Sequence, residues 1–136
     1  MVAVDAGPIV ALFDKSDDYH TICHKVIKSL RLPLTTTLPA LTEAFHLLSF
    51  SWQLQDALWE FVAGGNLMVY NLDTSLFREC RKLMQKYRDL PMDFADASLV
   101  AVSDKEDIRT VFTLDKDFRV YRTKDKKRFK LLPREF

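Results

Sequence analysis

The sequence lacks any apolar run long enough to cross a membrane. A membrane-spanning helix needs about 20 consecutive apolar residues, and every apolar run in this chain is much shorter than that. Residues 1–5 also lack the basic stretch that opens a secretory signal peptide. These two absences predict a cytoplasmic protein that does not associate with membranes.

Cysteine is scarce. Cys23 and Cys80 are the only two cysteines in the chain, and neither stands in a CxxC pair. In a protein without an export signal, we expect both to be reduced thiols that pack in the interior. Cys23 lies between His20 and His24 in one helical segment, but no fourth ligand is spaced nearby. We therefore favour a cluster on a helix surface over a metal site.

The common motifs of nucleotide and acyl chemistry are also missing. The chain has no Walker lysine loop, no GxGxxG, no GxSxG and no zinc-spaced set of cysteines and histidines. A phosphatase of the haloacid-dehalogenase type begins with a strand and an aspartate, as this chain does. It needs a second aspartate two residues later, where this chain has Gly7, so we discount that class.

What the chain does contain is an alternation of short β-branched or aromatic runs with segments of helical periodicity. The composition, 48% hydrophobic and 29% charged, is that of an ordinary globular protein. We predict a single domain over residues 1–136 of the α/β class, with a mostly parallel sheet covered by helices on both faces. Strands are predicted at 2–4, 34–37, 67–70, 110–114 and 129–132, and helices at 8–13, 17–30, 39–48, 51–63, 74–87 and 95–102.

One stretch, residues 93–118, brings carboxylates to two predicted element ends. Asp93 and Asp96 open an apolar helical segment, whereas Asp115 and Asp117 follow a buried strand. In an open parallel sheet, the carboxyl ends of the strands and the N-termini of the following helices face one crevice. We therefore expect these four acids to lie near one another.

Two further acids occupy similar positions. Asp5 follows the first predicted strand, and Glu43 lies in the first turns of the helix that begins at Pro39. Each has an ordinary alternative, since an aspartate caps a helix well and a carboxylate near a helix N-terminus is favoured by the dipole. If all six acids converge, they raise one another's pKa values. A hard divalent cation, Mg²⁺ or Mn²⁺, resolves such repulsion and activates water for attack on a phosphodiester.

Four short motifs carry a family resemblance. They resemble the motifs of the PIN-domain family, above all its single-domain, VapC-like toxin ribonucleases, and they stand in the same order over nearly the whole chain. They are VDAGP at 4–8, LTEA at 41–44, FADASL at 94–99 and TLDKDF at 113–118.

The resemblance implies an α/β/α sandwich and an Mg²⁺- or Mn²⁺-dependent endoribonuclease that hydrolyses RNA. It also implies a toxin with a small antitoxin protein as partner, and a homodimer. By motif match, Asp5, Glu43, Asp96 and Asp115 are the metal ligands and catalytic acids. Asp117 is a close catalytic candidate, because family members differ in which position of this segment is acidic. The alternative is a non-catalytic module that binds RNA or a protein, which has no need of so many converging acids.

The sequence departs from the family pattern at one place. Many members have a hydroxyl residue directly after the first acid, where this chain has Ala6 and Gly7. We expect Ser98 or Thr113 to supply the missing hydrogen bond. Asp93 matches no essential family position, so we interpret it as a helix cap.

The C-terminal segment is strongly basic. Residues 119–136 hold eight basic and two acidic residues, a net charge of +6, which leaves −5 for residues 1–118 of a chain whose net charge is +1. We predict that Lys124, Lys126, Lys127 and Arg128 contact RNA phosphates. A merely solvated surface is the alternative.

The predicted helix at 51–63 carries many aromatic residues. Trp52, Leu54, Leu58, Trp59 and Phe61 offer more aromatic surface than one internal face needs. Such surfaces mark interfaces, here that of a homodimer. The alternative is that both tryptophans belong to the core.

Overall fold

The structure is a computed structural model, and it describes residues 1–134. Within that range the strands form one five-stranded sheet in the order β3-β2-β1-β4-β5, with every neighbouring pair parallel. The predicted parallel sheet is thus confirmed. Glu135 and Phe136, included in the basic segment above, lie outside the described residues. The strands are β1 Val2–Val4, β2 Leu34–Thr37, β3 Leu67–Tyr70, β4 Thr110–Phe112 and β5 Lys130–Leu132.

The central strands are buried because helices cover both of their faces. Strand β2, with the sequence LTTT, is buried at all four positions, as expected for a parallel strand between two helical layers. Strand β4 ends at Phe112 rather than at residue 114. The chain bends there because the Thr113 hydroxyl accepts a hydrogen bond from the Asp115 backbone N–H at 3.0 Å, a turn typical of threonine.

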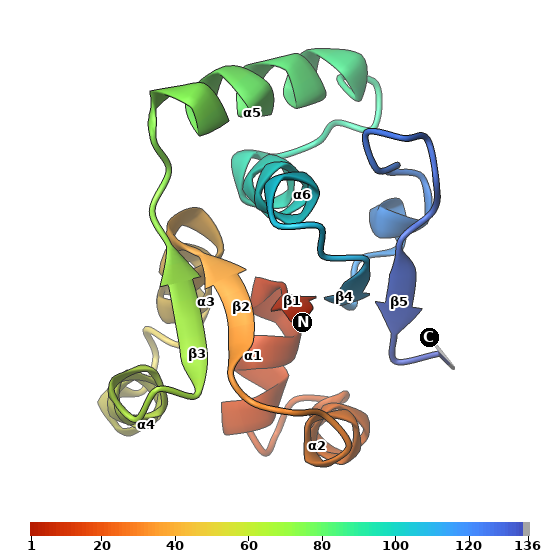
Figure 1. The fold of residues 1–136 in the computed structure, drawn as a ribbon. Helices are drawn as coiled ribbons and strands as arrows, with labels where there is room; N and C mark the ends of the chain where they lie inside the picture. The colour runs from red at the N-terminus through yellow and green to blue at the C-terminus, as the bar shows by residue number, and fades with distance from the viewer. Residues whose placement is uncertain (135–136) are drawn as a thin grey trace.

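The helices form two layers (Figure 1). Helices α5 and α6 lie above the sheet, and α1, α2 and α4 lie below it, so the predicted α/β/α sandwich is confirmed. Each layer packs its own core on the sheet: Ala3 and Val111 face one core, and Val4 and Phe112 face the other. The helices are α1 Ala6–Phe13, α2 His20–Lys28, α3 Leu38–Leu47, α4 Trp52–Ala63, α5 Thr74–Lys86 and α6 Phe94–Lys105, with a short 3₁₀ helix, η1, at Lys116–Arg119.

Side-chain caps fix where several helices begin. Asp5, Thr37, Ser51, Asp73 and Asp93 each stand at an N-cap and accept a backbone N–H of the following helix. The capping role expected for Asp93 is therefore confirmed.

Turns determine where helix α4 ends and where helix α2 begins. Helix α4 ends at two glycines, where Gly65 has a φ of 78° that a side chain would oppose. Helix α2 begins at His20 and not at residue 17, since the Asp17 carboxylate accepts the Tyr19 N–H and holds residues 17–19 in a turn.

Helix α6 positions the site. All residues from Ala95 to Ser103 are buried, because the helix lies between the sheet and α5. Small side chains let it approach the sheet, and the Ser98 hydroxyl bonds with Thr37 of β2 at 2.5 Å. The N-terminal end of α6 meets the carboxyl ends of β1 and β4, and its C-terminal end lies near the start of β4.

In the part of the chain that the structure describes, no helix has the length and apolar character of a membrane span. The expected cytoplasmic location stays a prediction.

Candidate metal centre

Three aspartates converge where β1, β4 and α6 meet. Asp5 follows β1, Asp115 follows β4, and Asp96 stands in the first turn of α6. One oxygen of each carboxylate lies within 4.8 Å of the others, and among the described residues this is the one group of three or more acids, histidines or cysteines with such spacing. The residues Asp5 and Asp96 are only 6% and 5% exposed, and Asp115 is half-buried.

Asp5 is held at both of its oxygens. One oxygen accepts the Ala6 backbone N–H at 2.8 Å, and the other accepts the Thr113 hydroxyl at 3.0 Å. The prediction that Ser98 or Thr113 supplies a hydrogen bond to Asp5 is therefore confirmed, for Thr113. Ser98, the other candidate, instead donates to the Ala95 carbonyl.

Asp96 is held by a residue that sequence reasoning missed. The Tyr121 hydroxyl donates to one Asp96 carboxylate oxygen at 3.0 Å. Tyr121 is fully buried, with its ring packed edge-on against Phe118 and Tyr87. The one signal in the sequence was an aromatic side chain in an otherwise basic segment, which points to burial rather than to a solvated surface.

Burial and like charge raise the pKa values of the converging acids. Burial chiefly, and then the charges of Asp5, Asp93 and Asp115, raise the pKa of Asp96 to about 9. Burial also raises the pKa of Asp5 to about 6, and the nearby Glu43 and Asp115 add to the effect. Ionised carboxylates at this spacing oppose each other, so the arrangement is suited to a cation with a preference for oxygen ligands.

Glu43 and Asp117 stand beside the group of three. Glu43, on α3, lines the same cleft of about 240 Å³ as Asp5, Asp96 and Asp115, but it is outside the group of three. Burial, followed by the charges of Asp93 and Asp115, raises the pKa of Glu43. Asp117 is also outside the group, and its backbone N–H donates to the Asp115 carboxylate at 2.9 Å. This bond holds the Asp115 carboxylate through the backbone of residue 117, and a catalytic role of the Asp117 carboxylate stays a prediction.

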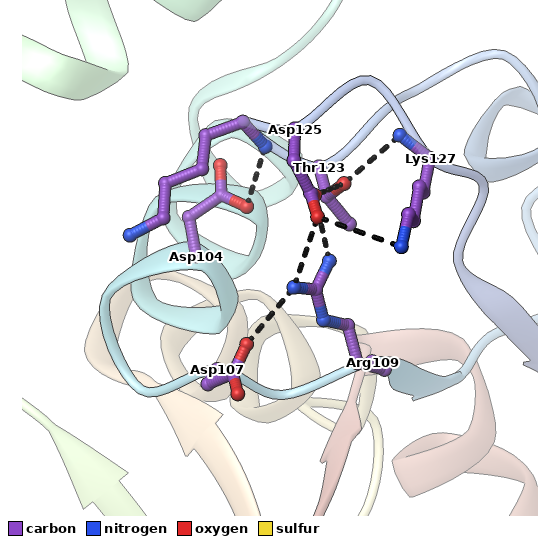
Figure 2. A network of polar contacts seen from close by, with 7 residues as sticks. Asp104, Asp107, Arg109, Thr123, Asp125 and Lys127 are labelled. Carbon is purple, nitrogen blue, oxygen red and sulfur yellow. Dashed lines mark hydrogen bonds and ion pairs between the residues drawn. The ribbon is translucent and has the colours of Figure 1, made fainter.

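The basic segment folds back at the other end of α6 (Figure 2). We call residues 122–128 the basic loop. The Lys124 backbone N–H donates to the Asp104 carboxylate at 3.0 Å, and Asp104 lies eight residues beyond Asp96, or about 12 Å along a helix.

An ion-pair network ties this loop to the start of β4. Arg109 bonds Asp125 at 2.8 Å and Asp107 at 3.0 Å, and the Lys127 ammonium lies 4.0 Å from Asp125 (Figure 2). The Thr123 hydroxyl also donates to Asp125. The structure therefore does not bring the basic loop to the carboxylates. Contact of RNA with the four exposed residues Lys124, Lys126, Lys127 and Arg128 stays a prediction.

The other expectations concern the cysteines, α2 and α4. Cys23 and Cys80 are buried, which confirms that the cysteines pack in the interior, and the expected surface cluster is wrong for Cys23. His20 bonds the Ala11 carbonyl at 2.7 Å. On α4, Trp52 is 66% exposed and Trp59 is 51% exposed. The alternative that both tryptophans are core residues is therefore wrong, while an interface at this surface stays a prediction.

The sequence has recognisable relatives. A model of the PIN domain matches residues 2–124. The chain is 25% identical over 133 residues to the ribonuclease VapC26 of Mycobacterium tuberculosis, an overlap that covers 96% of this chain and 98% of that protein.

Three solved structures share the fold. VapC20 of Mycobacterium tuberculosis, a toxin that cleaves the sarcin–ricin loop, has a TM-score of 0.82 at 20% identity, with 88% of this chain and 94% of that chain covered. A toxin–antitoxin complex from Klebsiella pneumoniae has a TM-score of 0.69 at 15% identity, with 87% and 90% covered. VapBC2 from Rickettsia felis, bound to a DNA fragment from its promoter, has a TM-score of 0.64 at 16% identity, with 96% and 97% covered.

Proposed function

The chain belongs to the PIN-domain family, and from this premise we propose that it is a divalent-metal-dependent endoribonuclease and the toxin of a toxin–antitoxin pair. The observation that carries the proposal is the convergence of Asp5, Asp96 and Asp115, with ligand oxygens within 4.8 Å of one another. A module that only binds RNA would gain nothing from buried carboxylates that repel its phosphates.

The donor set fits a hard cation. Asp5, Asp96 and Asp115 offer oxygen ligands alone, and we propose that they hold Mg²⁺ or Mn²⁺ directly, with Glu43 contributing from the rim of the cleft. These ions keep several waters when few carboxylates bind them. When bound, the ion activates a water and stabilises negative charge on the phosphate under attack.

The chain's own residues orient this centre. Thr113 and the Ala6 N–H fix the Asp5 carboxylate, and Tyr121 fixes that of Asp96. Such partners of metal ligands keep the ligand oxygens aimed at one point. Glu43 is half-buried at the rim, where burial raises the pKa of its carboxyl, and a carboxyl at this place is a candidate to exchange a proton with the attacking water.

The experiment measures cleavage of single-stranded RNA with Mg²⁺, with Mn²⁺ and with EDTA. We expect Asp5→Asn and Asp96→Asn to lose at least about 100-fold in rate, since loss of mere supporting partners already costs 10- to 100-fold. Asp104→Asn is the matched control, because it neutralises an acid on the same helix but outside the cleft. Equal activity in Asp96→Asn and Asp104→Asn would refute the site. Tight RNA binding by the parent without cleavage in either metal would favour the non-catalytic module.

The toxin role has its own test. Relatives of the chain include VapC toxins and toxin–antitoxin complexes, which supports a small antitoxin protein as partner. We expect expression of the parent to arrest growth, the Asp96→Asn variant to be harmless, and the product of an adjacent gene to relieve the arrest. Growth arrest of equal strength by Asp96→Asn would contradict an RNA-cleaving toxin.

A further inference from the structure

A second and larger cleft adjoins the metal centre. It measures about 790 Å³, within the range of small-ligand pockets, and it lies between one side of α3 and the N-terminal ends of α5 and α6. Glu43 and Asp93 line both this cleft and the smaller one that holds the three aspartates. An extended ligand can therefore occupy both clefts at once.

Two phenylalanines form one wall of the larger cleft. The rings of Phe77, on α5, and Phe94, the first residue of α6, lie 6.2 Å apart and only 26° from parallel. The two residues are 53% and 41% exposed. Phe94 and Asp96 point to different faces of α6, but Glu43 and Asp93 line both clefts, so a group stacked on this aromatic pair lies next to the cleft of the metal centre.

Charge limits what the cleft can accept. None of the described residues that line it is a lysine or an arginine, and the two acids stand where it meets the metal centre. A phosphate group would be repelled there, whereas a neutral aromatic ring would not. Thr42, His46 and Asn71 add exposed polar groups suited to the edges of such a ring.

We propose that this aromatic cleft binds an unpaired nucleobase of the RNA substrate, next to the phosphate that is cut. The inference rests on the proposed function and names its substrate class, which is single-stranded RNA. Proteins read unpaired RNA by stacking its bases on aromatic side chains and by bonding their edges. A base within a duplex remains stacked on its neighbours and does not enter.

The test measures binding without cleavage. In the inactive Asp5→Asn background, affinity for a short single-stranded oligoribonucleotide is measured by fluorescence anisotropy in EDTA. The RNA carries an abasic residue at each position in turn. We expect one position to cost about tenfold in affinity, a typical effect of losing one stacked base. The cost should disappear in Phe94→Leu and Phe77→Leu. Phe50→Leu is the control, because Phe50 is 66% exposed and lies outside the cleft.

Two results would overturn the proposal. The first is an abasic cost that persists in both cleft variants, or no abasic cost at all in the parent background. The second is a parent dimer in analytical ultracentrifugation that Phe77→Leu and Phe94→Leu convert to monomers, because a second copy would then cover the cleft.

Cleavage assays separate this inference from the proposed function. If the parent cuts RNA with Mn²⁺ and both cleft variants cut it equally well, the base site is wrong and the nuclease stands. If the parent cuts no RNA, the nuclease fails, and the anisotropy result alone decides whether the cleft binds a base.

Discussion

Two aspartates near opposite ends of helix α6 stand in opposite electrostatic settings: Asp96 in its first turn, and Asp125 in the basic loop that is tied to its C-terminal end. At the N-terminal end, Asp96 is buried beside other acids, and burial chiefly, followed by their charges, raises its pKa to about 9. At the C-terminal end, Asp125 is exposed beside Arg109. Hydrogen bonds from Arg109 and Thr123 hold the pKa of Asp125 well below its usual range.

The difference indicates that the acids near Asp96 serve a reaction, whereas those near Asp125 hold the structure together. The acids near Asp125 satisfy cations that the chain itself provides, and so they fix the basic loop to β4 (Figure 2). The acids near Asp96 raise one another's pKa values, and folding forces them together all the same. An electrostatic cost that persists in a fold is a mark of function rather than of stability.

The largest effect is expected from Asp96→Asn, which neutralises one of the converging acids at the N-terminal end of α6. The pKa of Asp96 is about 9 in the folded protein and about 4 when unfolded. The native state therefore binds more protons between these values, so the metal-free stability of the parent falls as pH rises from about 4 to about 9. The variant lacks this loss. In EDTA at pH 8 we expect its melting temperature to exceed that of the parent, by about 4 °C for each 1 kcal/mol.

With bound metal, we expect the parent to be more stable than Asp96→Asn, the reverse of the order in EDTA. A cation that binds only the folded site stabilises the parent by about 2.7 kcal/mol at a hundredfold excess over its dissociation constant. Asp96→Asn should gain much less from Mn²⁺, while it loses RNA cleavage. Thermal melts in EDTA and in Mn²⁺ at pH 5 and 8 check both points. A variant that is less stable than the parent in EDTA yet gains as much from Mn²⁺ would show that the acids do not form one metal site.

A smaller effect is expected from Tyr121→Phe, which tests how Asp96 is held at the N-terminal end of α6. The variant keeps the ring packing on Phe118 and removes the hydroxyl that donates to Asp96. We expect Mn²⁺ affinity to fall by 10- to 100-fold, the usual cost of losing a partner of a metal ligand. Tyr87→Phe is the matched control, since its hydroxyl accepts the Arg122 backbone N–H instead. Calorimetric titration with Mn²⁺ measures both, and an equal fall in both variants would reduce Tyr121 to a packing residue.

These two ends were not equally predictable from sequence. Asp5, Asp96 and Asp115 could be placed together because each adjoins a strongly patterned strand or helix, and parallel topology then fixes the common edge. Thr113 was one of two hydroxyl residues predicted to bond Asp5, and the structure selects it over Ser98. The prediction could not choose between Asp115 and Asp117. That choice depends on the turn held by Thr113, which brings Asp115 to the group.

The C-terminal end could not be predicted in the same way. The basic loop has no periodicity, and its path depends on Arg109, which is 16 residues away from Asp125 in sequence. Charge counting therefore identified the cations but not their distance from the acids. Tyr121 was missed for the same reason, since its contact with Asp96 exists only once residues 116–121 fold back along α6.

The basic loop is expected to affect RNA binding without affecting the chemistry of the metal centre. Replacing Lys124, Lys126, Lys127 and Arg128 by alanine should weaken the binding of long RNA. If all four contact phosphates, the log–log salt slope falls by about 0.7 for each, or about 2.8 in total. Very short RNA bound at the carboxylates should be cut at the parental rate, because the loop is tied to the far end of α6.

The control for the loop variant removes the same charge elsewhere. Lys15, Lys25, Lys28 and Arg31 lie on and around α2, and their replacement by alanine changes the net charge equally. Binding titrations over a range of salt concentrations compare the two variants. A slope that is unchanged, or that falls equally in both, would leave the loop a solvated surface.

The smallest effect is expected from Arg109→Gln, which removes the ion pair with Asp125 near the C-terminal end of α6. Arg109 and Asp125 are both 44% exposed at their side chains, and exposed ion pairs contribute little to stability and are screened by salt. Because the pKa of Asp125 is lowered in the folded protein, the pair stabilises above the unfolded pKa near 4 and loses this effect as pH falls through the folded value.

We therefore expect Arg109→Gln to melt slightly earlier than the parent at pH 7 and low salt, with the difference shrinking at high salt and at low pH. The loop should loosen, so hydrogen exchange should speed up at the Lys126 and Lys127 amides, which now bond Thr123. Cleavage of very short RNA should stay at the parental rate. Arg81→Gln, on exposed α5 surface, is the control. A loss of metal-dependent cleavage in Arg109→Gln would mean that the two ends of α6 are coupled, and that the division between them is wrong.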